Sequence, residues 1–160
     1  MGFQTRINND LPTGVAGDFA STNPHFSMLA GEGQLKSGAN GVIVGLFAWA
    51  DDKGLVSNAK TGDALIGFVH RNNQAIIMDY SEEATMLIPK GREITLMTGG
   101  DFFVNLEEGG KRGQFIVADV KTGKAKAVDA IDASDTNVEA TPFRVAKTVT
   151  KGLTKMSSSL

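Results

Sequence analysis

Short apolar runs, each closed by a turn signal, fill most of this 160-residue chain from residue 42 onward. Gly, Asp, Asn or Pro separates one run from the next. Strands at such regular spacing are typical of antiparallel sandwiches and barrels. We therefore expect an all-β fold, an antiparallel β-sandwich or jelly-roll-like barrel. The expected strands are 42–50, 63–70, 74–78, 84–88, 93–98, 102–106, 115–120, 124–128 and 143–150.

The composition fits a globular domain and excludes several classes of partner. The 19 glycines are roughly 12% of the chain, well above the usual ~7%, which suits a fold with many tight turns. The net charge of -2 gives no general attraction to nucleic acid or to an anionic membrane surface. No apolar stretch approaches the ~20 residues of a membrane span. We therefore expect neither nucleic acid nor a membrane among the partners.

Residues 1–40 show neither helical nor strand periodicity, and single large apolar residues are spread along them. Such a segment is too sparse to form a core of its own. It is either a flexible tail or an extended arm laid across another surface, and its apolar content favours the arm. We expect an extended N-terminal docking arm over residues 1–40 and a β domain over residues 41–160. The candidate docking residues are Phe3, Ile7, Leu11, Val15, Phe19 and Phe26.

Two hairpins and a central strand are expected inside the β domain. The run 42–49 is apolar on both alternations, which predicts a strand that is buried on both faces. Pro89 and Gly91 predict a hairpin over 85–96, and the turn 121–123 predicts a second hairpin. Lysines and alanines alternate in 124–127, which is typical of an edge strand with its lysines turned outward. The expected core residues are Ile43, Leu46, Phe47, Phe68, Ile77, Leu87, Ile94, Leu96, Phe103, Phe115, Val117 and Val145.

The side chains able to carry chemistry form no recognisable constellation. The chain has no Cys, and its only imidazoles are His25 and His70, so a zinc site is not expected. Glu82 and Glu83 are adjacent, and neighbouring strand residues point to opposite faces, which argues against an acid–base pair. The segment 31–38 lacks the second Gly of a phosphate-binding loop. We predict no catalytic residue, no metal site, no cofactor and no enzymatic activity.

Short motifs rich in Gly and Phe follow one another in a distinctive order. They are Gly14-Val15-Ala16-Gly17-Asp18-Phe19, Asn23-Pro24, Gly41-Val42, Phe47-Ala48-Trp49, Gly67-Phe68-Val69-His70-Arg71, Ile88-Pro89 and Gly99-Gly100-Asp101-Phe102-Phe103. In the order and spacing of these motifs, over about residues 12–156, the chain resembles the structural cement, or decoration, proteins of tailed-phage capsids.

The resemblance implies a small β-rich protein on the outer surface of an HK97-type capsid, where it ties capsomers together against the pressure of the packaged DNA. It implies the major capsid protein as partner, a homodimer slightly favoured over a homotrimer, and synthesis in the host cytoplasm before assembly into the virion. The alternative is a host- or sugar-binding β module of a virion, such as a fibre or receptor-binding domain. The single Trp and single Tyr count against a sugar site, which would use exposed aromatic residues.

Overall fold

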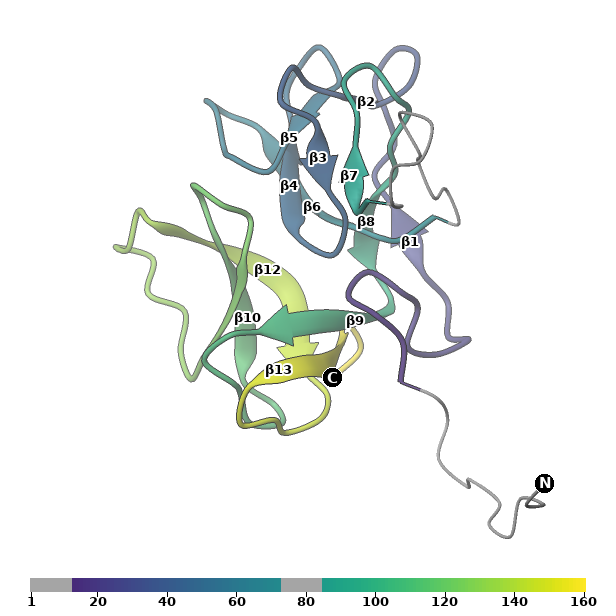
Figure 1. Cartoon of the computed structure of the whole chain (residues 1–160). Coiled ribbons are helices and arrows are strands. Elements are labelled where there is room, and N and C mark those ends of the chain that lie inside the picture. Colours follow the sequence, from purple (N-terminus) through teal and green to yellow (C-terminus); the bar gives the residue numbers. More distant parts are fainter. Residues whose placement is uncertain (1–12, 73–84) are drawn as a thin grey trace, which may run out of the picture.

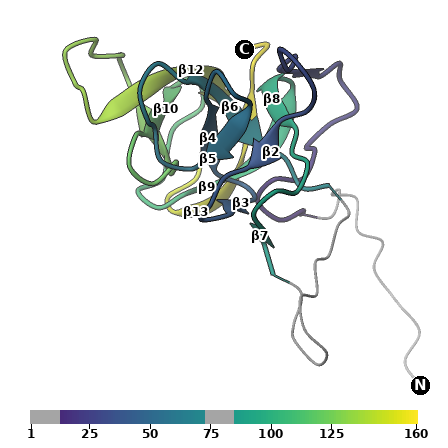
Figure 2. The same cartoon turned by 90° about the horizontal axis from the view of Figure 1, so that it is seen from above.

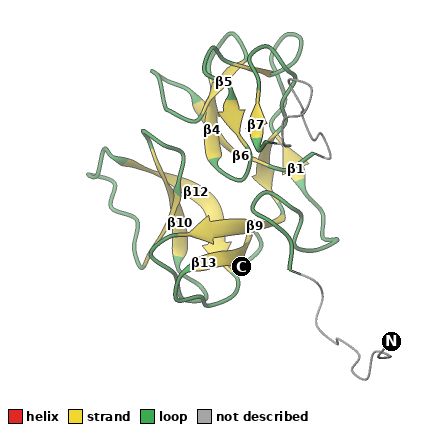
Figure 3. Cartoon of the chain, viewed as in Figure 1, coloured by secondary structure: helices red, strands yellow, loops and turns green. Residues whose placement is uncertain are grey.

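The computed structural model describes residues 13–72 and 85–160, and all regular structure in these ranges is β-strand (Figure 3). This confirms the all-β prediction. The strands are β1 (Phe26–Ser27), β2 (Lys36–Ser37), β3 (Val42–Ile43), β4 (Phe47–Ala50), β5 (Leu55–Ser57), β6 (Leu65–Val69), β7 (Leu87–Ile88), β8 (Leu96–Gly99), β9 (Asp101–Leu106), β10 (Phe115–Asp119), β11 (Ala125–Val128), β12 (Val138–Val145) and β13 (Gly152–Ser157).

The strands form two large sheets and one small ribbon. The six-stranded sheet has the order β1-β8-β6-β4-β5-β2, the five-stranded sheet the order β11-β10-β12-β13-β9, and β3 pairs with β7. Paired strands are antiparallel except β2 and β5, which are parallel. In Figure 1 the six-stranded sheet lies above the five-stranded one. The loop between β11 and β12 projects on the side away from β1, as Figure 1 and the view from above in Figure 2 both show.

Aromatic side chains fill the space between the two large sheets. Phe47 and Phe68 come from the six-stranded sheet, and Phe102 and Phe143 come from the five-stranded sheet. All four are fully buried, and the ring centroids of Phe68 and Phe102 lie 5.3 Å apart in a tilted arrangement. Tilted and edge-to-face aromatic pairs are the favourable geometries. This packing of one sheet against the other confirms the predicted sandwich.

A second apolar core lies on the other face of the six-stranded sheet. Trp49 of β4 belongs to the first core, whereas its neighbour Ala48 belongs to the second, as the alternation of side chains along a strand requires. The backbone N–H of Ser37 in β2 donates to the carbonyl of Arg92 at 2.8 Å. β2, the edge strand opposite β1, therefore lies beside the segment that leads into β8. The sheet in this way curls around the second core.

The run 42–50 does not form the single strand that its apolar pattern predicts. Gly45, with φ of 80°, turns the chain and separates β3 from β4. β4 is buried on both faces as predicted, but the core predictions for Ile43 and Leu87 are wrong. These two residues face each other in the β3–β7 ribbon and are exposed, because the ribbon turns its other face, with Val42, toward the core.

The two predicted hairpins have different outcomes. Gly91, with φ of 78°, does turn the chain, but the hairpin over 85–96 is wrong because β7 pairs with β3 while β8 pairs with β6 and β1. The second hairpin, β10–β11, is confirmed. β11 is an edge strand as predicted, and Lys124 beside it forms an ion pair with Glu107 at 2.7 Å.

The other core predictions are mostly confirmed. Leu46 and Phe115 are only half-buried, while Ile77 and the expected strand 74–78 lie outside the described residues. The last expected strand, 143–150, is displaced, because β12 starts at Val138 and ends at Val145. The residues confirmed as buried are Phe47, Phe68, Ile94, Leu96, Phe103, Val117 and Val145.

Candidate functional site

The N-terminal segment, residues 15–29, first lies along the free edge of β9 in the five-stranded sheet (Figure 1). Phe19 forms an antiparallel bridge with Phe102. The backbone N–H of Gly17 donates to the carbonyl of Phe103 at 2.9 Å, and the N–H of Phe103 donates to the carbonyl of Asp18 at 2.9 Å. Residues 17–20 therefore satisfy backbone groups that an edge strand otherwise leaves open.

The same segment then covers the edge of β8 in the six-stranded sheet. Phe26 of β1 lies opposite Gly99, and the N–H of Met28 donates to the carbonyl of Leu96 at 2.8 Å. Gly100, with φ of 124°, separates β8 from β9, and a Cβ placed on it would lie 2.8 Å from the Cβ of His25. The N-terminal segment thus follows the chain around this bend. It pairs with β9 at the edge of the five-stranded sheet, and its strand β1 pairs with β8 to form the edge of the six-stranded sheet.

A carboxylate anchors the loop that spans the bend. The hydroxyl of Ser21 and the side-chain amide of Asn23 each donate to Oδ2 of Asp101 at 2.6 Å. Burial acts to raise the pKa of Asp101, but hydrogen bonding from Ser157, Ser21 and Asn23 outweighs it, so the pKa lies below its usual value. Asp101 is therefore charged at neutral pH, and it holds residues 21–23 with charge-assisted hydrogen bonds.

A close backbone crossing fixes the segment farther toward its N-terminal end. A Cβ on Gly45 would lie 2.8 Å from the Cβ of Ala16, so the two chains touch where they cross. The N–H of Arg71 donates to the carbonyl of Gly17 at 2.7 Å, and its guanidinium forms an ion pair with Asp18 at 3.2 Å. From residue 16 to residue 28 the backbone is thus held by hydrogen bonds and contacts from several strands.

Three of the predicted docking residues lie on this segment as exposed apolar side chains. Val15 is 47% exposed, Phe19 is 40% exposed and Phe26 is 65% exposed. Phe19 is partly covered by ring contacts, and its centroid lies 4.6 Å from that of His25. Phe3, Ile7 and Leu11 lie outside the described residues. The described docking candidates are therefore apolar groups displayed on a fixed backbone, an arrangement suited to adhesion.

A groove begins where this segment leaves β8, and none of the residues that line it was predicted as a site from the sequence. The groove has a volume of about 650 Å³ and lies between residues 28–32 and the turn at 51–54. Leu29 and Leu65 line it, and they are the two most exposed large apolar side chains among the described residues. Leu65 lies within the apolar run 63–70, so the sequence pattern predicts a strand at this residue but does not indicate that its side chain is exposed.

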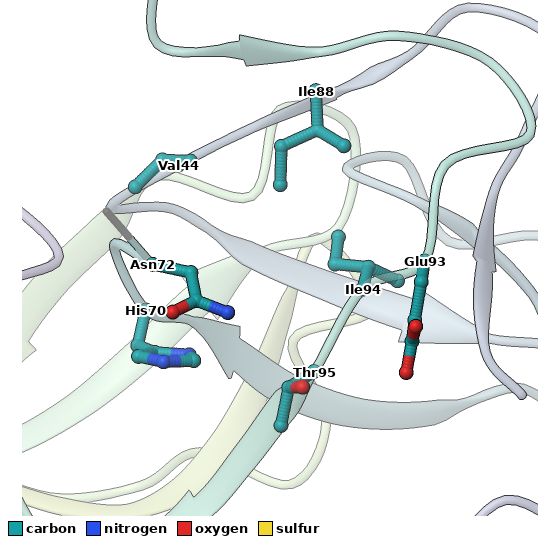
Figure 4. A pocket seen from close by; sticks show the side chains of 7 residues that line it. All are labelled: Val44, His70, Asn72, Ile88, Glu93, Ile94 and Thr95. Carbon is teal, nitrogen blue, oxygen red and sulfur yellow. The ribbon is translucent and has the colours of Figure 1, made fainter. Parts of the chain in front are cut away.

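A smaller pocket surrounds His70 (Figure 4). It has a volume of about 140 Å³, below the range of ordinary small-molecule sites. His70 and Asn72 lie on one side of it and Glu93 on the other. Burial lowers the pKa of His70; a hydrogen bond with the Thr95 backbone opposes this effect, and nearby His25 adds to it. His70 is therefore neutral at pH 7, and Glu93 is the other titratable residue that lines this pocket.

The described residues, 13–72 and 85–160, contain neither a cluster of metal-binding side chains nor a membrane-spanning helix. Within these ranges no group of three or more His, Asp or Glu side chains is placed to hold a metal ion. No helix with the length and apolar character of a membrane span occurs in the same residues.

Comparisons with known proteins agree with the fold and identify the family. No curated protein matches the chain. A chain from the solved capsid of Myoviridae phage XM1 has a similar fold, with a TM-score of 0.62 and 15% sequence identity over 99% of this chain and 98% of that chain. The family model of the XM1 gp53 minor capsid protein matches residues 3–158. Because that match spans nearly the whole chain, the protein belongs to the XM1 gp53 minor capsid protein family, a family of structural proteins of the phage capsid.

Proposed function

We propose that this minor capsid protein is a decoration, or cement, protein of an HK97-type phage head. It binds the outer surface of the capsid through the major capsid protein and ties neighbouring capsomers together against the pressure of the packaged DNA. The observation that carries the proposal is the N-terminal segment, which displays Val15, Phe19 and Phe26 to solvent while its backbone is fixed to both large sheets.

This arrangement favours binding for a physical reason. Burial of exposed apolar surface contributes roughly 25 cal/mol per Å², and association must also offset the entropy of the groups that it orders. A backbone that is held by β8 and β9 is already ordered before binding. Less of the free energy gained by apolar burial is therefore lost as conformational entropy. In this proposal residues 1–40 are the docking arm, and Phe3, Ile7 and Leu11 extend its apolar series. The arm is joined to the body, residues 41–160, by its strands β1 and β2, which are part of the six-stranded sheet.

We also propose that the protein acts as a homodimer. A clamp that crosses a joint between capsomers must present equivalent surfaces to equivalent neighbours, and a two-fold dimer does this with a single repeated contact. A homotrimer fits a three-fold joint by the same reasoning. Light scattering of the free protein, and counting of copies on the capsid, distinguish the two states from each other and from a monomer.

The function is tested with capsids that are assembled without this protein. We expect such capsids to lose DNA at a lower temperature than decorated ones, with a difference that grows with the length of the packaged genome. Adding the purified protein should restore DNA retention with a saturable dose response. If bare and decorated capsids retain full-length genomes equally well under heat and low salt, the cement function fails. Adsorption of bare and decorated particles to host cells then tests the host-binding alternative.

A further inference from the structure

The groove beside β1 has an apolar floor and two exposed leucines at its sides. Leu35 and Ala50 form part of the floor and are buried in the second core. Leu29 is 93% exposed and Leu65 is 68% exposed, although the core lies next to them. One exposed leucine needs no explanation, but two on the same concave surface form the kind of patch that marks a binding site.

One wall of the groove is a rigid turn. Oδ1 of Asp51 accepts hydrogen bonds from the N–H of Lys53 at 3.0 Å and from the N–H of Leu55 at 2.7 Å. The carbonyl of Gly54 accepts a hydrogen bond from the N–H of Lys36 in β2 at 2.8 Å, which ties the turn to the sheet. The wall is therefore formed before any partner arrives, and little of the binding free energy is lost in ordering it.

The rim of the groove is negatively charged. Glu32, Asp51 and Asp52 line it together with Lys53, so three carboxylates face one ammonium group. Oδ1 of Asp51 already accepts hydrogen bonds within the turn, whereas Glu32 and Asp52 are exposed to solvent. A segment that places an apolar side chain between the leucines and a Lys or Arg beside the carboxylates is complementary to the groove in both respects.

We propose that this groove is a second docking site, which binds an extended segment of the major capsid protein that carries an apolar side chain next to a lysine or arginine. The inference rests on the proposed function and deepens it. Continuity supports this occupant, because Leu29 follows Phe26 by three residues on the same N-terminal segment. The two sites then form one continuous contact along the capsid surface.

The test measures the binding of full-length variants to capsids that are assembled without this protein. Leu29→Ser should raise the dissociation constant about tenfold, as expected for loss of an anchor residue. Asp52→Lys should also raise it, and should weaken its dependence on salt concentration. The matched controls are Ile131→Ser, on the projecting loop between β11 and β12, and Glu108→Lys, which follows β9. Both controls should bind like the wild type.

Each outcome decides between defined alternatives. If Leu29→Ser and Asp52→Lys bind like the controls while Phe26→Ser binds weakly, the groove proposal is wrong and the proposed function stands. If the wild type itself does not bind the capsids, the proposed function is wrong. If the groove variants leave capsid binding unchanged but dissociate an oligomer in solution, the occupant is a second copy of this chain and the proposal is overturned.

Discussion

The contact between the two sheets at Gly123 gives a stability prediction with a matched control. Gly123 has φ of 71°, and the N–H of Phe47 in β4 donates to its carbonyl at 2.8 Å. A Cβ on Gly123 would overlap the carbonyl oxygen of Phe47, so the β10–β11 turn would have to move away from β4. Gly62 has a similar φ of 62°, and nothing lies within 4 Å of its Cβ position.

The two alanine variants therefore share the backbone strain and differ in the clash. Positive φ costs an alanine about 1–2 kcal/mol, and the loss of unfolded-state freedom returns about 0.4–1 kcal/mol, so Gly62→Ala should destabilise the fold by about 1 kcal/mol. Gly123→Ala also breaks the hydrogen bond from the buried N–H of Phe47, which adds about 2 kcal/mol. For a chain of this length these values correspond to losses in melting temperature of about 2–4 °C and about 6–12 °C. Equal losses in a thermal or urea unfolding experiment would contradict the argument.

Three further predictions concern the N-terminal segment and its surroundings. Phe26→Ser should change the free energy of unfolding by less than about 0.5 kcal/mol, because the side chain is exposed, yet raise the dissociation constant for bare capsids about tenfold. Asp101→Ala should cost about 1 kcal/mol and speed amide hydrogen exchange over residues 17–28; unchanged exchange rates would show that the loop does not need this anchor. The pKa of His70 is lowered in the folded state, so the unfolded chain takes up its proton at a higher pH and stability should fall as the pH drops below about 6.5. His70→Gln should flatten the melting temperature between pH 7.5 and pH 5.5, and a slope equal to that of the wild type would exclude His70 as its cause.

The sandwich was predictable because its core follows from local patterns of apolar residues. The run that contains Phe47 and Trp49 is apolar on both alternations, and its strand is indeed buried on both faces. Gly45 within that run was the available sign of a break, since a glycine inside a strand pattern often marks a bend. Taking the run as one strand placed Ile43 in the core, although it lies on the outer face of the ribbon.

Strand pairing could not be read from the sequence in the same way. Pro89 and Gly91 correctly predicted a turn, but a turn forms a hairpin only when its flanking strands pair, and here their partners are far away in the chain. The N-terminal segment was harder still. It pairs with β8 and β9 through backbone N–H and carbonyl groups, which every residue type except proline has in full. No periodic pattern of apolar side chains therefore indicates this pairing in the sequence. The adhesive role of Val15, Phe19 and Phe26 stays a prediction.

The pairing of the N-terminal segment bears on how a decoration protein would carry load. Under the proposed function, outward pressure on the capsid pulls on the docking residues and the force passes through residues 16–28. The hydrogen bonds of Gly17, Asp18 and Ala20 with β9 lie across the direction of the segment, so a pull along it strains them together rather than one at a time. The bonds from Ser21 and Asn23 to Asp101 follow behind them. Because β9 belongs to one sheet and β8 to the other, the same pulling force is transmitted to both sheets of the sandwich. The strength of docking therefore depends on the stability of the folded body as well as on the apolar residues at the surface.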